Sequence, residues 1–165
     1  MKNCIIRCLL ALSICSFNSC CSKMERATQT QPPLSENFEI LINDSNSNIL
    51  EEKSMIIDNE EKLKEFYEIL NATRSPGFKI PKVDFNTQSV IVVAMGQQNT
   101  GGYSISSPSY NLKQGVYEFY FSRPLTNTPV TMSMTTPGIV VVANQPASEI
   151  SIKVTKRSTK YGDHF

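Results

Sequence analysis

Two glycines that follow an apolar run have the spacing to bind a phosphate group. Gly96 and Gly101 form a G-x-x-x-x-G pattern directly after the apolar residues 90–95. A phosphate-binding loop also needs a lysine after its last glycine, and then a serine or threonine for magnesium. Here Gly102 and Tyr103 follow instead, and the next residues alternate as a strand does, so no helix N-terminus is expected to hold an anion. We therefore expect no nucleotide site.

The residue types that enzymes use for acid, base and nucleophilic chemistry are scarce in the body of the chain. The single histidine, His164, is expected to lie in a polar C-terminal tail. All five cysteines lie within the first 21 residues, so the rest of the chain offers no thiol nucleophile and no Cys/His metal cluster. No spacing of acids indicates a catalytic carboxylate pair. The sequence thus predicts a protein that is not an enzyme and needs no cofactor or metal.

The first 21 residues have the layout of a secretory signal. A short basic start leads into an apolar stretch, and small residues precede Cys20 and Cys21. A cysteine at this place resembles the processing site of bacterial lipoproteins, where it becomes the acylated N-terminus. We predict a signal peptide over residues 1–19 and lipidation at Cys20, with Cys21 as the alternative site. A plain signal peptide with incidental cysteines is the competing interpretation. Either way the protein is expected in the bacterial cell envelope, at the outer membrane or facing the periplasm.

The charge balance gives no sign of a nucleic-acid partner. Removal of residues 1–19 leaves fourteen basic and fifteen acidic residues, a net charge of −1. Basic side chains gather only near the C-terminus, at Lys153, Lys156, Arg157 and Lys160. A solvated chain end explains that grouping at least as well as an anionic partner does.

The chain divides into a tether, one domain and a tail. Residues 20–37 are poor in apolar side chains and contain Pro32 and Pro33, which predicts a flexible tether. A single folded domain is expected over residues 38–156, followed by a polar tail over residues 157–165.

One helix is expected, and the remaining elements are strands. Asp58 is placed to cap the helix, with Glu61 completing a capping box. An apolar stripe at helical spacing follows at Leu63, Phe66, Tyr67 and Leu70. Strands are predicted over residues 38–42, 55–57, 89–95, 103–106, 116–121, 131–134, 139–143 and 150–154.

Short separations between these strands favour antiparallel pairing. Residues 89–95 are apolar almost throughout and therefore predict a central strand covered on both faces. The fold class is thus α+β, a predominantly antiparallel β-sheet or small sandwich with one packed α-helix.

Two interpretations of Gly101 and Gly102 are open. In the first, they only supply the positive φ of a hairpin or bulge. In the second, they also expose backbone beside the ring of Tyr103 and so form a surface for another protein. Alternation would place Tyr103 and Ile105 on one face of the strand, and Ser104 and Ser106 on the other.

Two segments resemble the C-terminal domain of the protease complex subunit PrcB. They are "VDFNTQSVIVVAMGQQNTGGYSI" at residues 83–105 and "PVTMSMTTPGIVVV" at residues 129–142. The shared features are Asp84-Phe85, Gly96, the Thr-Gly-Gly-Tyr loop and a later Thr-Pro, in this order. The resemblance implies a secreted or lipid-anchored bacterial protein, because the named member is an anchored lipoprotein that helps to assemble and stabilise a surface protease.

A second resemblance is to chagasin-type inhibitors of cysteine proteases. The segments "NTGGY" at residues 99–103 and "RPL" at residues 123–125 are similar to two of their loops. The threonine of the first loop lacks its preceding proline, and Leu125 stands where an aromatic residue is usual. This resemblance implies an inhibitor in place of an accessory subunit.

Both resemblances imply that the glycine loop contacts a protein partner, with a secreted or surface protease as the candidate. An envelope binding module unrelated to proteases is the third alternative. Tyr103 is expected to be an exposed ring and the main energetic anchor. The predicted partner-binding residues are Asn99, Thr100, Gly101, Gly102, Tyr103, Thr136 and Pro137.

Overall fold

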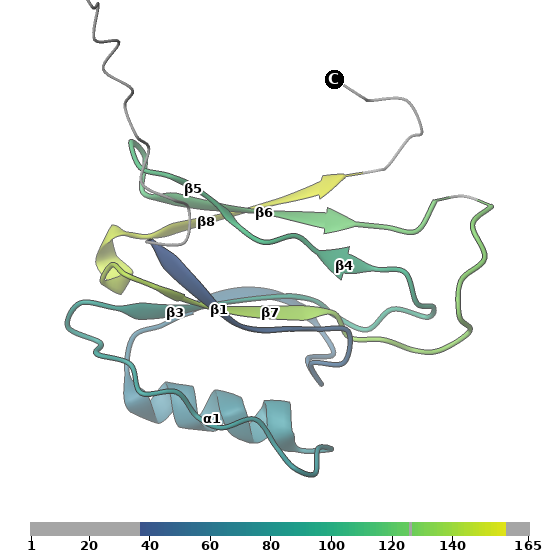
Figure 1. Ribbon diagram of the computed structural model, residues 1–165, viewed down its shortest axis with the longest axis horizontal. Helices are drawn as coiled ribbons and strands as arrows, with labels where there is room; N and C mark the ends of the chain where they lie inside the picture. The colour runs from purple at the N-terminus through teal and green to yellow at the C-terminus, as the bar shows by residue number, and fades with distance from the viewer. Residues whose placement is uncertain (1–36, 126, 158–165) are drawn as a thin grey trace, which may run out of the picture. The chain divides into compact units, whose positions relative to one another are not determined.

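The computed structural model describes residues 37–125 and 127–157, which form two β-sheets and one α-helix (Figure 1). Cys20, Cys21 and His164 lie outside these residues, so the predictions about them stay predictions. In chain order the elements are β1 (Phe38–Asp44), β2 (Glu52–Ile57), α1 (Glu60–Asn71), β3 (Ser89–Met95), β4 (Ser104–Ile105), β5 (Ser109–Asn111), β6 (Val116–Ser122), β7 (Gly138–Ala143), the 3-10 turn η2 (Ala147–Glu149) and β8 (Ser151–Arg157).

The first sheet has the strand order β1-β7-β3-β2, and each neighbouring pair is antiparallel. Its two central strands, β3 and β7, are buried along their whole lengths. Both are Val/Ile-rich, which suits strands that are covered on both faces. The prediction of a central strand over residues 89–95 is confirmed.

Helix α1 covers one face of the first sheet (Figure 1). Its four predicted apolar residues, Leu63, Phe66, Tyr67 and Leu70, are all buried. The predicted cap is wrong by one residue. Asn59 is the N-cap and accepts a hydrogen bond from the Lys62 N–H at 2.9 Å. Asp58 instead pairs with the Lys62 ammonium at 2.8 Å, because the extended backbone of Asn59 already aims an amide oxygen at the first turn.

The second sheet is built around β6. Strands β4 and β5 pair antiparallel with successive parts of β6, and β8 pairs with it in parallel along its whole length. The predominantly antiparallel pairing that the sequence predicts therefore has an exception in β8. The chain leaves β6, passes through β7 in the first sheet, and returns through η2 to β8, so the two paired strands are not joined by a hairpin.

The domain has two apolar cores, one on each face of the first sheet. Alternate side chains of β3 and β7 meet inward residues of β6, including Phe119 and Phe121, between the two sheets. The other side chains of β3 and β7 meet α1. The strands thus form two separate open sheets, with the helix on the far side of the first (Figure 1). The α+β class is confirmed.

Residues 131–134 do not form the predicted strand. All four are exposed, and Met132 and Met134 keep 90% and 66% of their surface accessible. Alternation alone predicted a strand, but a strand also needs a ladder of backbone hydrogen bonds, and none of these residues belongs to a strand pair in the described part of the chain. None of the helices among the described residues is long and apolar enough to span a membrane.

Candidate protein-binding site

Three loops meet at one end of the first sheet. They comprise residues 45–50, 96–103 and 127–137, and we call them the loop end. Gln98 and Thr135 exchange backbone hydrogen bonds of 2.7 and 2.9 Å. The Thr136 N–H donates to the Ser45 carbonyl at 2.7 Å, and the Gln97 N–H donates to the Leu50 carbonyl at 3.0 Å. Because backbone groups join all three loops, they form one fixed surface.

The glycine loop is shaped by contacts with its neighbours. The Gly101 N–H donates to the Thr131 carbonyl at 2.9 Å, so this amide is already engaged. Gly102 has φ +86°, and a Cβ there would lie 3.0 Å from Pro124 Cβ and 3.3 Å from Val130 Cγ1. The conformation requires glycine on both grounds. The loop leads into β4 and not into a helix, so it lacks the helix N-terminus that assists phosphate binding.

The structure brings the predicted site residues together, but most of them hold the loops in place. Gly101 and Pro137 are buried, and the Pro137 carbonyl accepts the Met95 N–H at 2.9 Å. The Thr136 hydroxyl accepts the Asn48 N–H at 3.1 Å, and the Thr100 carbonyl accepts the Thr135 hydroxyl at 3.1 Å. Of the seven predicted residues, only Asn99 and Gly102 are exposed.

Tyr103 is half-buried and packs against the core between the two sheets, so the expectation of an exposed ring is wrong. Ile105 is buried and Ser104 is exposed, so the predicted alternation along this strand is confirmed. The ring lies on the Ile105 side because it follows the same two-residue period. Whether Tyr103 also contacts a partner stays a prediction.

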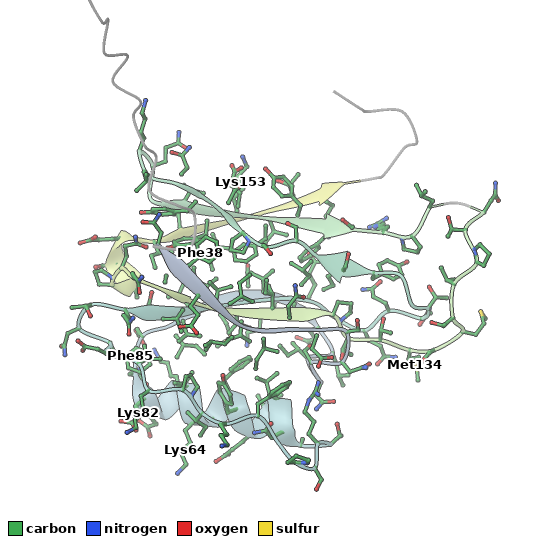
Figure 2. All side chains as sticks on the ribbon, viewed as in Figure 1. Phe38, Lys64, Lys82, Phe85, Met134 and Lys153 are labelled. Carbon is green, nitrogen blue, oxygen red and sulfur yellow. The ribbon has the colours of Figure 1, made fainter. Side chains whose placement is uncertain are left out.

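The sequence interpretation placed the Pro129–Pro137 segment at the contacting edge but did not single out three exposed apolar residues at the loop end. Met132 and Met134 are 90% and 66% exposed, and Leu50 is 66% exposed. Figure 2 shows Met134 on the outer side of its loop, where its sulfur accepts the Gln97 side-chain N–H at 3.1 Å. Methionine is flexible and polarisable, which suits a surface that adapts to a partner. Pro129 and Pro137 on either side of these methionines were the available signal of a loop.

The loop end is free of charge. Residues 45–50, 85–112 and 124–148 contain no Asp, Glu, Lys or Arg. The side chains of the three loops therefore offer amide, hydroxyl, thioether and methyl groups. Burial of apolar side chains is left as the main source of affinity at this end.

The outward face of the second sheet carries a small charged cluster instead. The Lys153 ammonium donates to Glu118 Oε1 at 2.7 Å, and the Tyr120 hydroxyl donates to Glu118 Oε2 at 3.0 Å (Figure 2). The hydrogen bond from Lys153 has the larger effect and that from Tyr120 the smaller, and together they hold the pKa of Glu118 below its usual range. Lys156 pairs with Glu52 of β2 at 2.8 Å. Two members of the basic C-terminal grouping are thus neutralised within the domain.

We expect the lowered pKa of Glu118 to make stability depend on Lys153 at acid pH. The folded pKa lies below the unfolded one, so this contribution is present above the unfolded pKa, about 4.3. It is lost as pH falls through the folded pKa. Lys153→Gln should therefore lose less stability than wild type between neutral and acid pH, as urea midpoints would measure. Lys113→Gln is the control, and equal losses in Lys153→Gln and wild type would contradict the assignment.

The described residues contain no group of three or more His, Cys, Asp or Glu side chains that could hold a metal ion. The surface that stands out in this part of the chain is the loop end, which fits contact with another macromolecule.

The fold is an α+β domain, and its loop end presents three exposed apolar side chains on loops joined by backbone hydrogen bonds. Residues 89–144 match the family model described as PrcB C-terminal. The match runs from β3 to the residue after β7 and includes two of the three loops. No curated protein and no solved structure matches the chain.

Substitutions at Tyr103 and Gly102 should both reduce stability. Tyr103→Ala removes a ring that packs on the core, and we expect a loss of about 2 kcal/mol, less than for a fully buried aromatic residue. Gly102→Val forces a β-branched residue to positive φ and should lose a similar amount. Urea unfolding of both variants checks this. Tyr103→Phe serves as the control, and an unchanged midpoint for Tyr103→Ala would show a ring that contributes nothing to the core.

Proposed function

We propose that this protein is a lipid-anchored, non-catalytic protein-binding module that serves as an accessory, stabilising subunit of a cell-envelope protease complex. The observation that carries the proposal is the PrcB C-terminal match over residues 89–144, which includes two loops of the loop end, residues 96–103 and 127–137. The uncharged, apolar character of the loop end supports it further, because such a surface suits a protein partner.

The loop end would bind by burying Leu50, Met132 and Met134. Full burial of one such side chain contributes about 2 kcal/mol, and because Leu50 and Met134 are already about one third buried, the three together supply a gross gain of about 4 kcal/mol. The fixed backbone of the three loops keeps the entropy loss on binding small, since only the side chains must be ordered. Exposed amides such as that of Asn99 would add hydrogen bonds at the rim.

An accessory subunit stabilises its protease, whereas an inhibitor suppresses it. The test is deletion of the gene followed by measurement of protease amount and activity in the cell envelope. The proposal expects both to fall and to return when the full chain is supplied again. Higher protease activity in the deletion strain would contradict an accessory role.

An inhibitor of cysteine proteases is a second candidate, because the structure places its two loop segments together. A Cβ at Gly102 of the "NTGGY" segment would lie 3.0 Å from Pro124 of the "RPL" segment. Loops from one end of an inhibitor can enter a protease cleft in this arrangement. Stoichiometric inhibition of papain by the purified protein would favour this candidate, and the accessory proposal expects none.

Anchoring at Cys20 is expected to attach the domain to a membrane through its acyl chains. Feeding cells with labelled fatty acid should label the wild-type protein, and Cys20→Ser should lose nearly all of the label. Cys15→Ser, within the apolar stretch of the signal, is the control that should keep it. Label that survives in Cys20→Ser and disappears in Cys21→Ser would assign the neighbouring cysteine, and an unlabelled wild type would contradict the anchor.

A further inference from the structure

Strand β2 (Glu52–Ile57) lies at an edge of the first sheet, and its first residue adjoins Gly96 of the loop end. Among the described strands it pairs only with β3. The Met95 N–H points to the β7 side of β3, where it donates to Pro137, so alternation turns the N–H of Ala94, Val92 and Val90 towards β2. The β2 residues opposite these three point inward. The N–H and C=O groups that face outward are those of Glu52, Ser54 and Ile56.

A pocket of about 200 Å³ lies beside this edge, between β2 and α1. Its apolar lining comes from Ile49, Met55, Phe66 and Val92. Ile69 of α1 forms part of the same lining and is 54% exposed. Ile69 thereby extends the apolar lining of the pocket to the helix surface, where an apolar side chain could cover both.

Charged side chains line the pocket on both its β2 side and its helix side. Lys53, on the β2 side, forms no ion pair with a described residue. Lys62 is paired with Asp58 at 2.8 Å, and Glu65 lies on the helix side. Lys53 and Met55 are two residues apart in β2, so both side chains point to the face that carries α1.

The other edge of the first sheet is less suited to strand addition. Strand β1 has a bulge between Ile40 and Ile42, which interrupts the row of backbone groups. The β2 edge has a regular register from Glu52 to Ile57.

We propose that the β2 edge binds an extended segment of a protein partner as an added antiparallel or parallel strand. The segment carries a large apolar side chain over the pocket and, two residues away, an acidic side chain beside Lys53. Backbone hydrogen bonds to Glu52, Ser54 and Ile56 supply affinity, and the two side chains supply specificity. The Lys53 ammonium, which forms no ion pair with a described residue, would pair with that acid. This binding is independent of the loop end.

The test uses the full-length protein, labelled with nitrogen-15, and two blocked heptapeptides. One is acetyl-Thr-Ser-Asp-Thr-Phe-Thr-Thr-amide and the other has the same residues in reverse order, because strand direction is open. Binding should shift the amide signals of residues 52–57. Lys53→Glu should weaken binding about tenfold, since an attraction becomes a repulsion. A peptide with Lys in place of Asp should bind Lys53→Glu about as tightly as the original peptide binds wild type. The same lysine peptide should bind wild type only weakly.

Two further variants separate the edge from the pocket. Ser54→Pro removes an outward N–H and leaves the ladder to β3 intact, so it should weaken both peptides while the rest of the spectrum is kept. Ile69→Asp should weaken the phenylalanine peptide, and Ile80→Asp, at a residue 46% exposed elsewhere, should not. Lys64→Glu is the matched control for Lys53→Glu, because Lys64 is exposed on α1 and does not line the pocket.

Several results would overturn the proposal. One is that neither peptide causes shifts at about 5 mM. Another is that the shifts are confined to residues 96–103 and 127–137. A third is that the lysine peptide binds Lys53→Glu no more tightly than it binds wild type. Shifts of residues 52–57 that depend on protein concentration without peptide would assign the edge to a second copy of the chain, and would also overturn it.

Discussion

Replacing both Met132 and Met134 by aspartate is expected to weaken partner binding by at least about 100-fold. Each methionine is largely exposed in the free domain, so the substitutions remove no core contact. In the complex, each carboxylate would have to lose its hydration in an interface to which residues 127–137 and 96–103 contribute no charged side chain. The melting temperature should stay within about 2 °C of wild type, because exposed substitutions rarely alter stability. Affinity and melting temperature, measured on the same preparations, check both parts.

The control for this double variant is Leu112→Asp. Leu112 is 53% exposed and lies between β5 and β6, outside the three loops. It should bind the partner as wild type does. Met132→Leu with Met134→Leu should also bind, since volume and apolar character are kept. Full binding by the aspartate variant would show that the methionines are not the contact surface.

Gly96→Val is expected to cause the largest loss of stability, about 3 kcal/mol or more and about 10 °C in melting temperature. Gly96 has φ +72°. A Cβ there would lie 2.7 Å from the Glu52 nitrogen, 2.9 Å from the Glu51 carbonyl carbon and 3.0 Å from the Leu50 oxygen. All three are backbone atoms, so no side chain can move aside, and the start of β2 must shift away from β3.

Gly77→Ala is the comparison that isolates the backbone clash. A Cβ at Gly77 would approach the side chain of Asn71 at 2.8 Å, and a side chain can rotate where a backbone cannot. Its loss should be about 1 kcal/mol, mainly from the hydrogen bonds between Asn71 and Phe78. Chemical denaturation of the two variants in parallel measures the difference. Equal losses would mean that the close approach of Gly96 to β2 is relieved elsewhere.

The elements that the sequence predicted correctly are those with a strong apolar period. Leu63, Phe66, Tyr67 and Leu70 fix the buried face of α1 through helical spacing. The inward residues of β6 follow the two-residue period of a strand with one covered face. The sequence of β3 is a continuous apolar run because the second sheet covers one of its faces and α1 covers the other.

Features set by contacts between distant segments could not be predicted in this way. The parallel pairing of β8 depends on the path of the chain through β7, which periodicity does not encode. Thr131 to Met134 alternate as a strand would, yet none of them pairs with a described strand, and such pairing is not encoded by alternation. The choice of Asn59 over Asp58 as helix cap depends on a single pair of backbone angles.

The candidate site shows the same division. The sequence correctly brought the residue 99–103 loop together with Thr136 and Pro137, because both flank apolar strands that lie side by side in the sheet. It could not tell that Tyr103 turns towards the core while Met132 and Met134 face solvent. Those orientations follow from the closing of three loops on one another.

Photo-crosslinking in native membranes tests the central claim most directly. A photoreactive amino acid is placed at Met134 in one full-length protein and at Leu112 in another, and the crosslinked products are identified by mass spectrometry. The account predicts that position 134 yields one dominant product containing an envelope protease and that position 112 does not. A protease crosslinked equally from both positions, or a dominant product from position 134 that contains no protease, would contradict it.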